Sequence, residues 1–419
     1  MNLDWSRLHA VVLESDDWGL CAWTPDEQAH RVLADTPAFR SPAGQRYGTS
    51  TLESADDVRL LVESLSVFRG KDGFPPVWQA NTVMAAPDYS RLAPPAFEAD
   101  ALPLVDLPQT PSRWKRPRLW EQVTFARLSG MWWPELHGLH HLPEQAWLQA
   151  LRRGAADARR AFEQQSPVCG AVQASSEYDP TEPVAVRARN LEQAIDRFTR
   201  LMGHPPGSMC PPDYRWDDQL ESDAERLKLT TIQGKTEQHG ARWPRIRRLV
   251  QQHRWPWRRG ERFYLPPRIA FEPIAREPGI GILAAHHAVR DAWGRGQPAI
   301  LSSHRVNYAQ LDPEASEAGR AALRDLLARV CRDGAVFLTD MEVRQLEDRR
   351  WSLRPVGDRG VLLRYHAVPR EPVRFTAPAG TQSVTLREGH DSDADLFLED
   401  REITVRANVG EYLIEWVRS

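Results

Sequence analysis

The chain has little of three features that would each indicate a particular class of protein. It has only 4 cysteines in 419 residues and no CxxC pair, so neither a disulfide framework nor a thiolate zinc site is indicated. It has no apolar run long enough to span a membrane, and its first residues lack the basic and apolar regions of a signal peptide. We therefore predict a protein of a reducing compartment, the cytoplasm.

A charge excess of either sign is missing as well. Lys and Arg together number 54 against 57 Asp and Glu, a formal net charge of −3. This near balance disfavours a strongly cationic nucleic-acid binder and a membrane-surface binder. Hydrophobic residues at 41% and charged residues at 26% are typical of a globular protein. The expected partners therefore include no nucleic acid and no membrane span, and nothing predicts an oligomeric state.

Short apolar runs alternate with helical periodicity over about the first 340 residues. Strands are predicted at 9–13, 77–83, 168–174, 229–233, 280–284, 299–303 and 335–339, and helices at 55–68, 143–164, 184–202 and 313–333. Asp312 is a candidate N-cap for the last helix. Strands that alternate with helices predict an α/β fold with a parallel sheet, either open or closed into a barrel.

The pattern changes after about residue 350 to short alternating segments separated by glycines, which predict a small β-sandwich. We therefore predict two domains, an α/β domain over 1–348 and an all-β domain over 349–419. Two stretches, 87–118 and 240–267, are rich in proline or in Arg, Trp and Pro, and we expect them to be long loops that act as lids or binding loops.

Two adjacent carboxylates follow the first predicted strand. The strand runs directly into Asp16 and Asp17, and active sites of α/β proteins lie at the carboxyl ends of strands. Consecutive strand residues point in opposite directions, so both can face one pocket only if the chain turns, as Gly19 would allow. The alternative is a solvated pair that caps the next helix.

Histidines form two further candidate functional sites. His137 and His141 have the spacing that puts two imidazoles on one face of a helical turn to bind one cation, and His140 could replace His141. His304 ends the predicted strand at 299–303, where it could act as a general acid or be a hydrogen-bonded strand-end residue. The pair His286 and His287 with Asp291 is expected in a core or substrate-lining role. Strand-end acids without an assigned chemistry are Glu177, Asp179 and Asp340.

The order of these motifs resembles the NodB-type polysaccharide deacetylases of carbohydrate esterase family 4, over about residues 9–340. The resemblance implies a distorted TIM-like (β/α)7 barrel and a divalent metal, with Zn²⁺ as the leading candidate. It implies that Asp16 is the catalytic base and His304 the catalytic acid. The implied metal ligands are Asp17, His137 and His141.

The chain also departs from the family pattern. The family's arginine that holds the base is replaced by Cys210, so either Arg215 or Arg305 takes its place or the site is altered. The family's Thr-Phe before the two carboxylates is replaced by Glu14-Ser15, and the tryptophan motif is not evident at 230–235. We expect the substrate to contact Trp18, Tyr214, Arg215 and Arg305.

The resulting hypothesis is a metal-dependent hydrolase that removes the N-acetyl group from an acetylated amino sugar. Zinc held by two imidazoles and one carboxylate keeps a position open for water. Two alternatives remain at this point. One is a metal-dependent hydrolase of another C–N bond or of a glycosidic bond on the same fold, and the other is a non-catalytic carbohydrate-binding protein.

Overall fold

The centre of the computed structural model is a large, mostly parallel sheet. The structure describes residues 3–170, 172, 176–234, 255–275, 277, 279–358, 360–367, 371–389 and 394–418. The strand order is β10-β11-β1-β2-β5-β6-β7-β9-β8, and β12 also pairs with β1. Among the described strands of this sheet, every pair is parallel except β8 and β9. The predicted parallel α/β sheet is therefore confirmed.

Apart from β1, which has 9 residues, the strands of the large sheet are short. They are β1 (Ala10–Trp18), β2 (Trp78–Thr82), β5 (Trp132–Leu136), β6 (Ser208–Met209), β7 (Thr231–Gly234), β8 (Trp257–Arg259), β9 (Arg262–Pro267), β10 (Ile269–Ala270), β11 (Ala299–His304) and β12 (Val336–Leu338). A separate two-stranded sheet pairs β3 (Ala85–Pro87), at the start of the predicted loop 87–118, with β4 (Leu104–Asp106) inside it.

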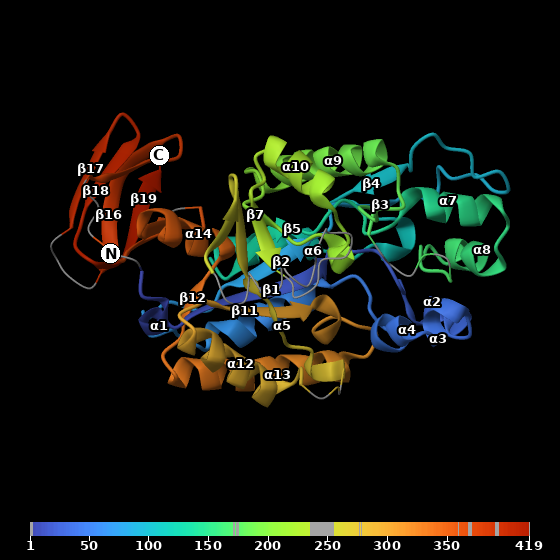
Figure 1. Ribbon diagram of the computed structural model, residues 1–419, viewed down its shortest axis with the longest axis horizontal. Helices are drawn as coiled ribbons and strands as arrows, with labels where there is room; N and C mark the ends of the chain where they lie inside the picture. Colours follow the sequence, from blue (N-terminus) through green and yellow to red (C-terminus); the bar gives the residue numbers. More distant parts are fainter. Residues whose placement is uncertain are drawn as a thin grey trace.

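Helices cover the sheet on both sides, with α9 and α10 on one side and α12 and α13 on the other (Figure 1). The helices of at least seven residues are α2 (Glu27–Leu33), α5 (Ala55–Ser66), α6 (Leu119–Leu128), α7 (Glu144–Arg152), α8 (Ala156–Glu163), α9 (Val184–Met202), α10 (Asp218–Arg226), α12 (Ile282–Gly294), α13 (Pro313–Arg332) and α14 (Asp340–Arg349). Shorter helical turns are α1 (Trp5–Leu8), α3 (Pro37–Arg40), α4 (Pro42–Tyr47), η1 (Ser112–Trp114), η2 (Pro212–Tyr214), η3 (Pro273–Ala275) and η4 (Arg305–Asn307). Asp312 caps α13 by accepting a hydrogen bond from the Glu314 N–H, as predicted.

Alternation along β1 determines which side chains face the interior. Val11 and Leu13 pack into the core beneath α5 and α13. Ala10 and Val12 belong to a different core, shared with residues of β9, β11, β12 and α14. Because strand side chains alternate with a period of two, Glu14 and Asp16 continue the row of Ala10 and Val12. The first strand thus directs two carboxyl groups towards the interior.

The parallel strands of the large sheet run in the order from β10 to β9, which we call the parallel series. A single residue of the chain separates the two strands at its ends. Strand β9 pairs with β7 and ends at Pro267, and β10 pairs with β11 and begins at Ile269. The segment 262–270 therefore reaches both ends of the series, and Arg268 lies between its two halves.

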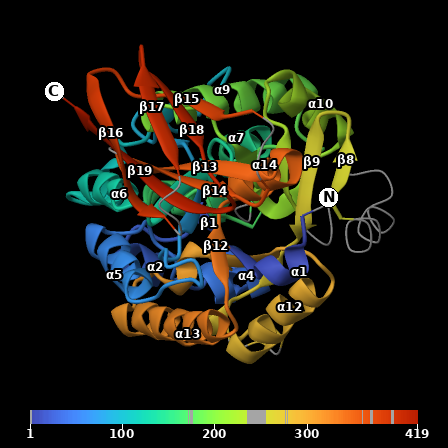
Figure 2. The same cartoon turned by 90° about the vertical axis from the view of Figure 1, so that its left-hand side faces the viewer.

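The residues after α14 form two antiparallel sheets at one end of the molecule (Figures 1 and 2). One has the order β13-β14-β19-β16 and the other β15-β18-β17. Side chains from both sheets share one hydrophobic core. The strands are β13 (Trp351–Val356), β14 (Gly360–Tyr365), β15 (Val373–Thr376), β16 (Thr381–Gly389), β17 (Asp395–Glu399), β18 (Glu402–Arg406) and β19 (Gly410–Arg418).

Several element predictions were wrong. The strand predicted at 280–284 overlaps the start of α12, because Ala285, Val289 and Ala292 continue its apolar run at helical spacing. The helix predicted at 143–164 is two helices, since Gly154 adopts a positive φ of 73° between them. In the predicted strand 168–174, the described residues form only an isolated bridge.

The predicted loop 240–267 lies partly outside the described residues. Residues 240–254 are not described, and residues 257–267 include β8 and β9, so the loop prediction was wrong there. All 4 cysteines lie in the described part and are free thiols. Among the residues described, no helix combines the length and the apolar character needed to cross a membrane.

Candidate active site

The chain turns sharply at the end of β1, as two adjacent carboxylates facing one cavity require. Asp17 has φ 74° and Gly19 has φ 76°, and the register between β1 and β2 shifts between Ser15 and Trp18. Asp and Gly are among the residues that tolerate this left-handed conformation. Both Asp16 and Asp17 consequently line the same cavity.

Asp17 meets the two predicted histidines at this cavity. Its Oδ1 lies 3.4 Å from His137 Nε2 and 3.6 Å from His141 Nε2, and the three residues form a group that could hold a metal ion. Ligand atoms held at about 2.0–2.2 Å from one zinc ion in a tetrahedral arrangement lie roughly 3.3–3.6 Å apart. The donor set and its spacing therefore fit a divalent metal.

Protonation also suits these groups to metal binding. His137 Nδ1–H donates to the Cys210 carbonyl oxygen at 2.8 Å, which turns Nε2 towards Asp17. Burial would lower the pKa of His137, but Asp16, Asp17 and Cys210 raise it overall, so a metal bound at Nε2 would take the place of a proton. Burial lowers the pKa of His141, which favours the neutral imidazole that a metal needs. Burial alone would raise the pKa of Asp17, but its contacts with His137 and His141 lower it overall, so Asp17 is a carboxylate.

The histidines are not on a helical turn as predicted. Residues 137–143 are a loop that follows β5, with φ 89° at Gly138 and 57° at His141. Sequence reasoning missed the role of Glu177, whose Oε1 accepts a hydrogen bond of 2.5 Å from the Leu139 N–H inside this loop. His140 does not belong to the ligand group with Asp17, and burial lowers its pKa to about 3.

Asp16 is held by an arginine that the sequence did not point to. Arg268 Nη1 lies 2.9 Å from Asp16 Oδ2, and Arg268 Nη2 lies 2.9 Å from Asp16 Oδ1. Asn81 Nδ2 also donates to Asp16 Oδ1 at 2.6 Å. Burial would raise the pKa of Asp16, but the charges of Arg268, His137 and His304 and the Asn81 hydrogen bond together lower it to about 2. The buried carboxyl is therefore ionised at neutral pH.

Neither arginine that was expected to hold the base does so. Arg215 pairs with Asp179 and Asp213, and Arg305 is fully buried against Glu53 and the Leu20 carbonyl oxygen. Arg268 was missed because it comes one residue after the segment 240–267, which was predicted to be a loop. Its position directly after the apolar run of β9 was the available signal.

The predictions were wrong for two of the four residues that were expected to contact the substrate. Trp18 is 1% exposed, packs in the core and donates through Nε1 to Ser15 Oγ at 3.0 Å. Arg305 is 0% exposed. Both are too deeply buried to contact a substrate. Tyr214 and Arg215 do line the cavity.

His304 ends β11 close to Asp16. Its Nε2 lies 3.9 Å from Asp16 Oδ2, while its Nδ1 contacts Glu272 Oε1. Asn307 Nδ2 holds the other Glu272 oxygen at 2.6 Å. Burial alone would lower the pKa of His304, but Glu272, together with Asp17 and Asp16, raises it overall. Glu272, like Arg268, was not identified from the sequence.

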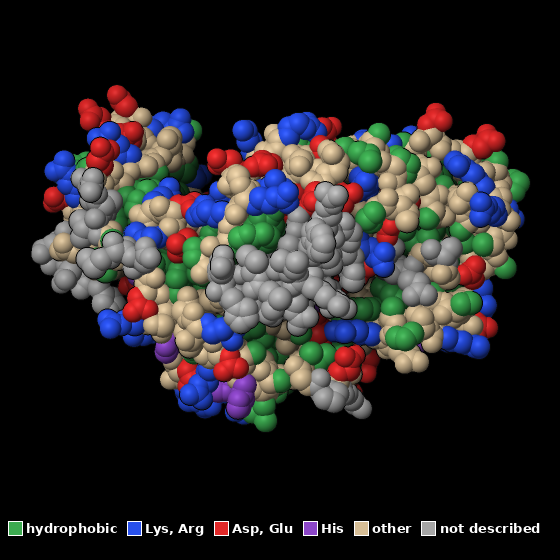
Figure 3. All heavy atoms as spheres, viewed as in Figure 1, with side chains coloured by type: hydrophobic (Ala, Val, Ile, Leu, Met, Phe, Trp, Pro, Cys, Tyr) green, Lys and Arg blue, Asp and Glu red, His purple; other side chains and the backbone are tan. Residues whose placement is uncertain are grey.

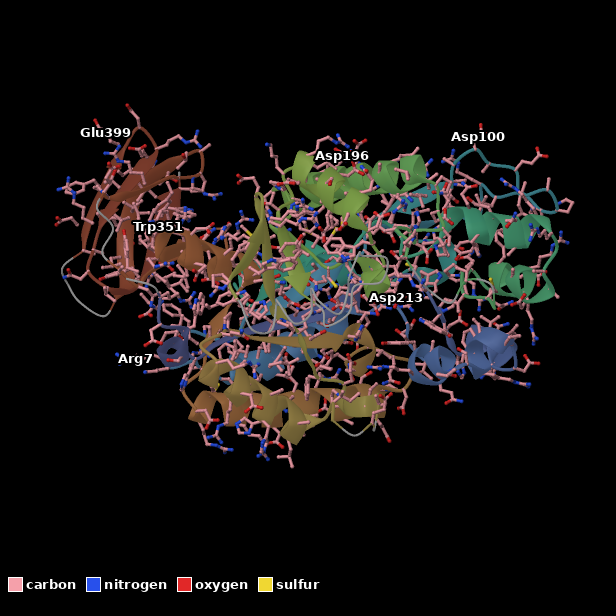
Figure 4. The ribbon with its side chains drawn as sticks, viewed as in Figure 1. Arg7, Asp100, Asp196, Asp213, Trp351 and Glu399 are labelled. Carbon is pink, nitrogen blue, oxygen red and sulfur yellow. The ribbon has the colours of Figure 1, made fainter. Side chains whose placement is uncertain are left out.

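These groups surround one cavity of about 730 Å³. Aromatic and charged side chains complete its lining, among them Trp23, Arg46, Tyr47, Asp213, Tyr214 and Arg215. Asp213, labelled in Figure 4, lies near the middle of the molecule. Acidic and basic side chains are interspersed on the face seen in Figure 3.

A second possible ligand group overlaps the first. Asp16, His137 and Cys210 also bring ligand atoms together. Here, however, Arg268 Nη1 lies 3.1 Å from Cys210 Sγ and bonds to Asp16. A guanidinium already compensates the charge of this group, so the group with Asp17 is the better metal site.

Comparison with known proteins gives only remote likenesses. No family model matches the chain, and no curated protein matches it. A solved structure from Mycobacterium smegmatis, assigned as a polysaccharide deacetylase, is 13% identical with a TM-score of 0.41, over 80% of this chain and 90% of that one. Agd3, described as a novel carbohydrate deacetylase, is 10% identical with a TM-score of 0.38, over 98% of this chain and 65% of that one.

A third solved structure is a mutant of BA3943, described as a pseudoenzyme of carbohydrate esterase family 4. It is 10% identical with a TM-score of 0.32, over 80% of this chain and 67% of that one. Likenesses this remote assign no activity to the chain, so its function must be argued from the geometry of the site.

Proposed function

We propose that this protein is a metal-dependent hydrolase that removes an N-acetyl group from an amino-sugar-containing glycan or glycan precursor. One observation carries the proposal. Asp17, His137 and His141 converge with ligand spacing beside an ionised Asp16 and a histidine with a raised pKa, all on one cavity. The motif order shared with the polysaccharide deacetylases supports the same reading.

The metal would be held by Asp17 Oδ1, His137 Nε2 and His141 Nε2. A bound divalent cation, which we propose to be Zn²⁺, supplies Lewis acidity and a water of lowered pKa. The Cys210 carbonyl oxygen fixes the ring of His137, and Glu177 fixes the loop between the two histidines.

Asp16 would accept the proton of the attacking water. Its carboxylate is ionised because Arg268 bonds to both of its oxygens. The same two-point contact fixes the plane of the carboxylate, which leaves Asp16 little freedom to turn away from the cavity. A base held in one orientation contributes more to the reaction than a mobile one.

His304 would donate a proton to the departing amine. An amine leaves poorly as an anion, so amide cleavage needs a proton donor. Glu272 accepts from His304 Nδ1, which leaves the Nε2–H to face Asp16 and the cavity. The raised pKa of His304 keeps the imidazolium available at neutral pH.

The cavity suits a sugar. Its volume of about 730 Å³ lies in the range of small-molecule sites. Trp23, Tyr47 and Tyr214 offer apolar ring surface to a sugar face, and the arginines of the lining already pair with carboxylates. A neutral acetylated sugar fits this balance better than a strongly charged ligand.

We also propose that the large sheet forms the distorted barrel implied by the resemblance. The segment 262–270 joins both ends of the parallel series, and the core inside β1 includes residues of β9 and β11. The two C-terminal sheets would then form a separate β-sandwich domain, with the domain boundary near residue 348.

Metal content is the first measurement. Protein purified without a metal-affinity tag should contain about one zinc or similar ion per chain by elemental mass spectrometry. A His137→Ala, His141→Ala double variant should lose that ion. The matched control is a His286→Ala, His287→Ala double variant, whose histidines lie on α12 outside the cavity.

Acetate release from acetylated amino sugars is the second measurement. Asp16→Asn should abolish turnover and leave the metal in place, because Asp16 is not in the ligand group with Asp17. A wild-type protein that takes up no stoichiometric metal, even after addition of zinc, would contradict the proposal. Sugar binding without turnover, unchanged in Asp16→Asn, would identify a carbohydrate-binding protein instead.

A further inference from the structure

A closed ring of buried polar side chains lies beneath the candidate base. Its members come from four strands, β1, β2, β6 and β7, from the start of α14 and from Arg268. They are Glu14, Asp16, Gln79, Asn81, Ser208, Gln233, Arg268 and Asp340, and none is more than about a tenth exposed. Polar groups this deeply buried need partners, because each unsatisfied one costs free energy.

One half of the ring runs from Asp16 to Asp340 through uncharged side chains. Asn81 donates to Asp16 at 2.6 Å and exchanges two hydrogen bonds, of 2.8 and 2.9 Å, with Gln233. Gln233 Nε2 reaches Ser208 Oγ at 3.0 Å, and Ser208 Oγ donates to Asp340 Oδ2 at 2.7 Å. This half fixes Asp340 from one side.

The other half of the ring consists of ionisable side chains. Arg268 bonds to both oxygens of Asp16 with its two terminal nitrogens, and its Nε contacts Glu14 Oε2. The carboxyl groups of Glu14 and Asp340 lie close together. Both edges of the guanidinium are thereby engaged by carboxyl groups.

Two carboxyl groups can form a hydrogen bond with each other only if one carries a proton. Among the described residues, neither oxygen of Glu14 and not Oδ1 of Asp340 receives a hydrogen bond from an N–H or hydroxyl donor. Asp340 Oδ2 accepts from both Gln79 Nε2 and Ser208 Oγ at 2.7 Å. These two donors stabilise a charge on Asp340, so the proton belongs on Glu14.

We propose that Glu14 is a protonated positioning residue, which bridges Asp340 and Arg268 and so holds the Arg268 guanidinium in its two-point contact with Asp16. The inference rests on the proposed function, in which Asp16 is the base. Charge supports it, because three buried carboxyl groups share one guanidinium in this ring. Burial also raises the pKa of Glu14 well above its usual range.

The test compares two substitutions of the same residue. Glu14→Gln keeps the size of the side chain, an oxygen for Arg268 and an N–H donor for Asp340, so it should retain turnover. Glu14→Leu removes both contacts and should lower kcat by roughly 10- to 100-fold with KM and metal content unchanged. A purely structural role for Glu14 would not predict a lowered kcat in Glu14→Leu together with retained turnover in Glu14→Gln.

Infrared spectroscopy tests the proton independently of activity. At neutral pH, the carbonyl stretch of a protonated carboxyl group should be present in the wild type and reduced in Glu14→Gln. Glu221→Gln is the matched control, since Glu221 is equally buried but pairs with the Arg262 cation, and its spectrum should match the wild type. An unchanged band in Glu14→Gln would overturn the proposal, even if the Leu variant did not fold.

The two proposals can fail separately. If the wild type binds metal but releases no acetate from any substrate, the proposed function fails. Crystal structures of the two variants then test the positioning role of Glu14. The two-point contact between Arg268 and Asp16 should be lost in Glu14→Leu and kept in Glu14→Gln. Arg268 unmoved in Glu14→Leu, or equal kcat in Glu14→Leu and the wild type, would overturn the inference.

Discussion

Asp16 depends on a contact that only an arginine can make. A guanidinium presents two parallel N–H groups to the two oxygens of a carboxylate, whereas an ammonium is a single point charge. Arg268 uses both of its terminal nitrogens on Asp16, at 2.9 Å each.

Arg268→Lys should therefore lower turnover by roughly 10- to 100-fold, because Asp16 loses its fixed orientation although a positive charge remains. Steady-state acetate release measures this, and metal content should not change. Arg187→Lys is the matched control, since Arg187 is also buried but makes an ion pair with Asp217 outside the cavity. Equal losses in both variants would show that the effect of Arg268 is only structural.

As the proposed acid, His304 should set the alkaline limit of activity. Glu272 raises its pKa, so the imidazolium persists to higher pH than in a free histidine. Activity that needs this proton should be full below the folded-state pKa and fall as the pH rises through it. The stability contributed by the pair follows the same direction.

Glu272→Gln removes the charge that raises the pKa, so the alkaline limb of the kcat/KM profile should move to lower pH. The measurement is the pH dependence of acetate release in both proteins. An alkaline limb at the same pH in wild type and variant would remove His304 as the acid.

At the scale of elements, the path of the loop after β5, which carries two of the proposed metal ligands, depends on one glycine. Gly138 has φ 89°, and a Cβ there would lie 2.3 Å from Glu177 Oε1 and 2.8 Å from Pro212 Cγ. The loop that carries both histidines can adopt its path only because this position has no side chain.

Gly138→Ala should weaken zinc binding by roughly 10- to 100-fold, because the loop must move away from Glu177. Competition with a chelator measures this affinity. Gly203→Ala is the matched control, with φ 81° at the end of α9 and no heavy atom within 4 Å of the new Cβ. It should cost about 1 kcal/mol of stability and leave zinc affinity unchanged. Unaltered affinity in Gly138→Ala would show that the loop is not rigidly held.

At the scale of the whole molecule, buried charge joins the C-terminal sheets to the rest of the chain. Arg364 of β14 is fully buried and pairs with Glu342 of α14 and, at 2.8 Å, with Asp72. Arg354 of β13 also pairs with Glu342, at 3.1 Å. Removing one partner of such a cluster leaves an uncompensated buried charge.

Arg364→Met should lower the free energy of unfolding by roughly 3–5 kcal/mol and should expose the chain near residue 350 to limited proteolysis. Thermal unfolding and proteolysis measure the two effects. Arg374→Met, which removes an ion pair whose arginine is 61% exposed, should change stability by less than about 0.5 kcal/mol. Similar effects of the two substitutions would contradict a joining role for the cluster.

The sequence by itself determined the features that depend on local pattern. Alternation and helical spacing predicted β1, α9 and α13, and the strand ends predicted Asp16, Asp17 and His304 at the carboxyl edge of a parallel sheet. The spacing of His137 and His141 identified both residues, although on a loop rather than a helical turn.

Only the tertiary structure decided which charged groups meet at that edge. Arg268 and Asp16 are 252 residues apart in the chain, and His304 and Glu272 meet between different elements. The same structure buried Trp18 and Arg305, which the sequence had placed at the substrate. Periodicity reports the face on which a residue lies, whereas contacts between distant residues follow from strand order and register, which no local pattern contains.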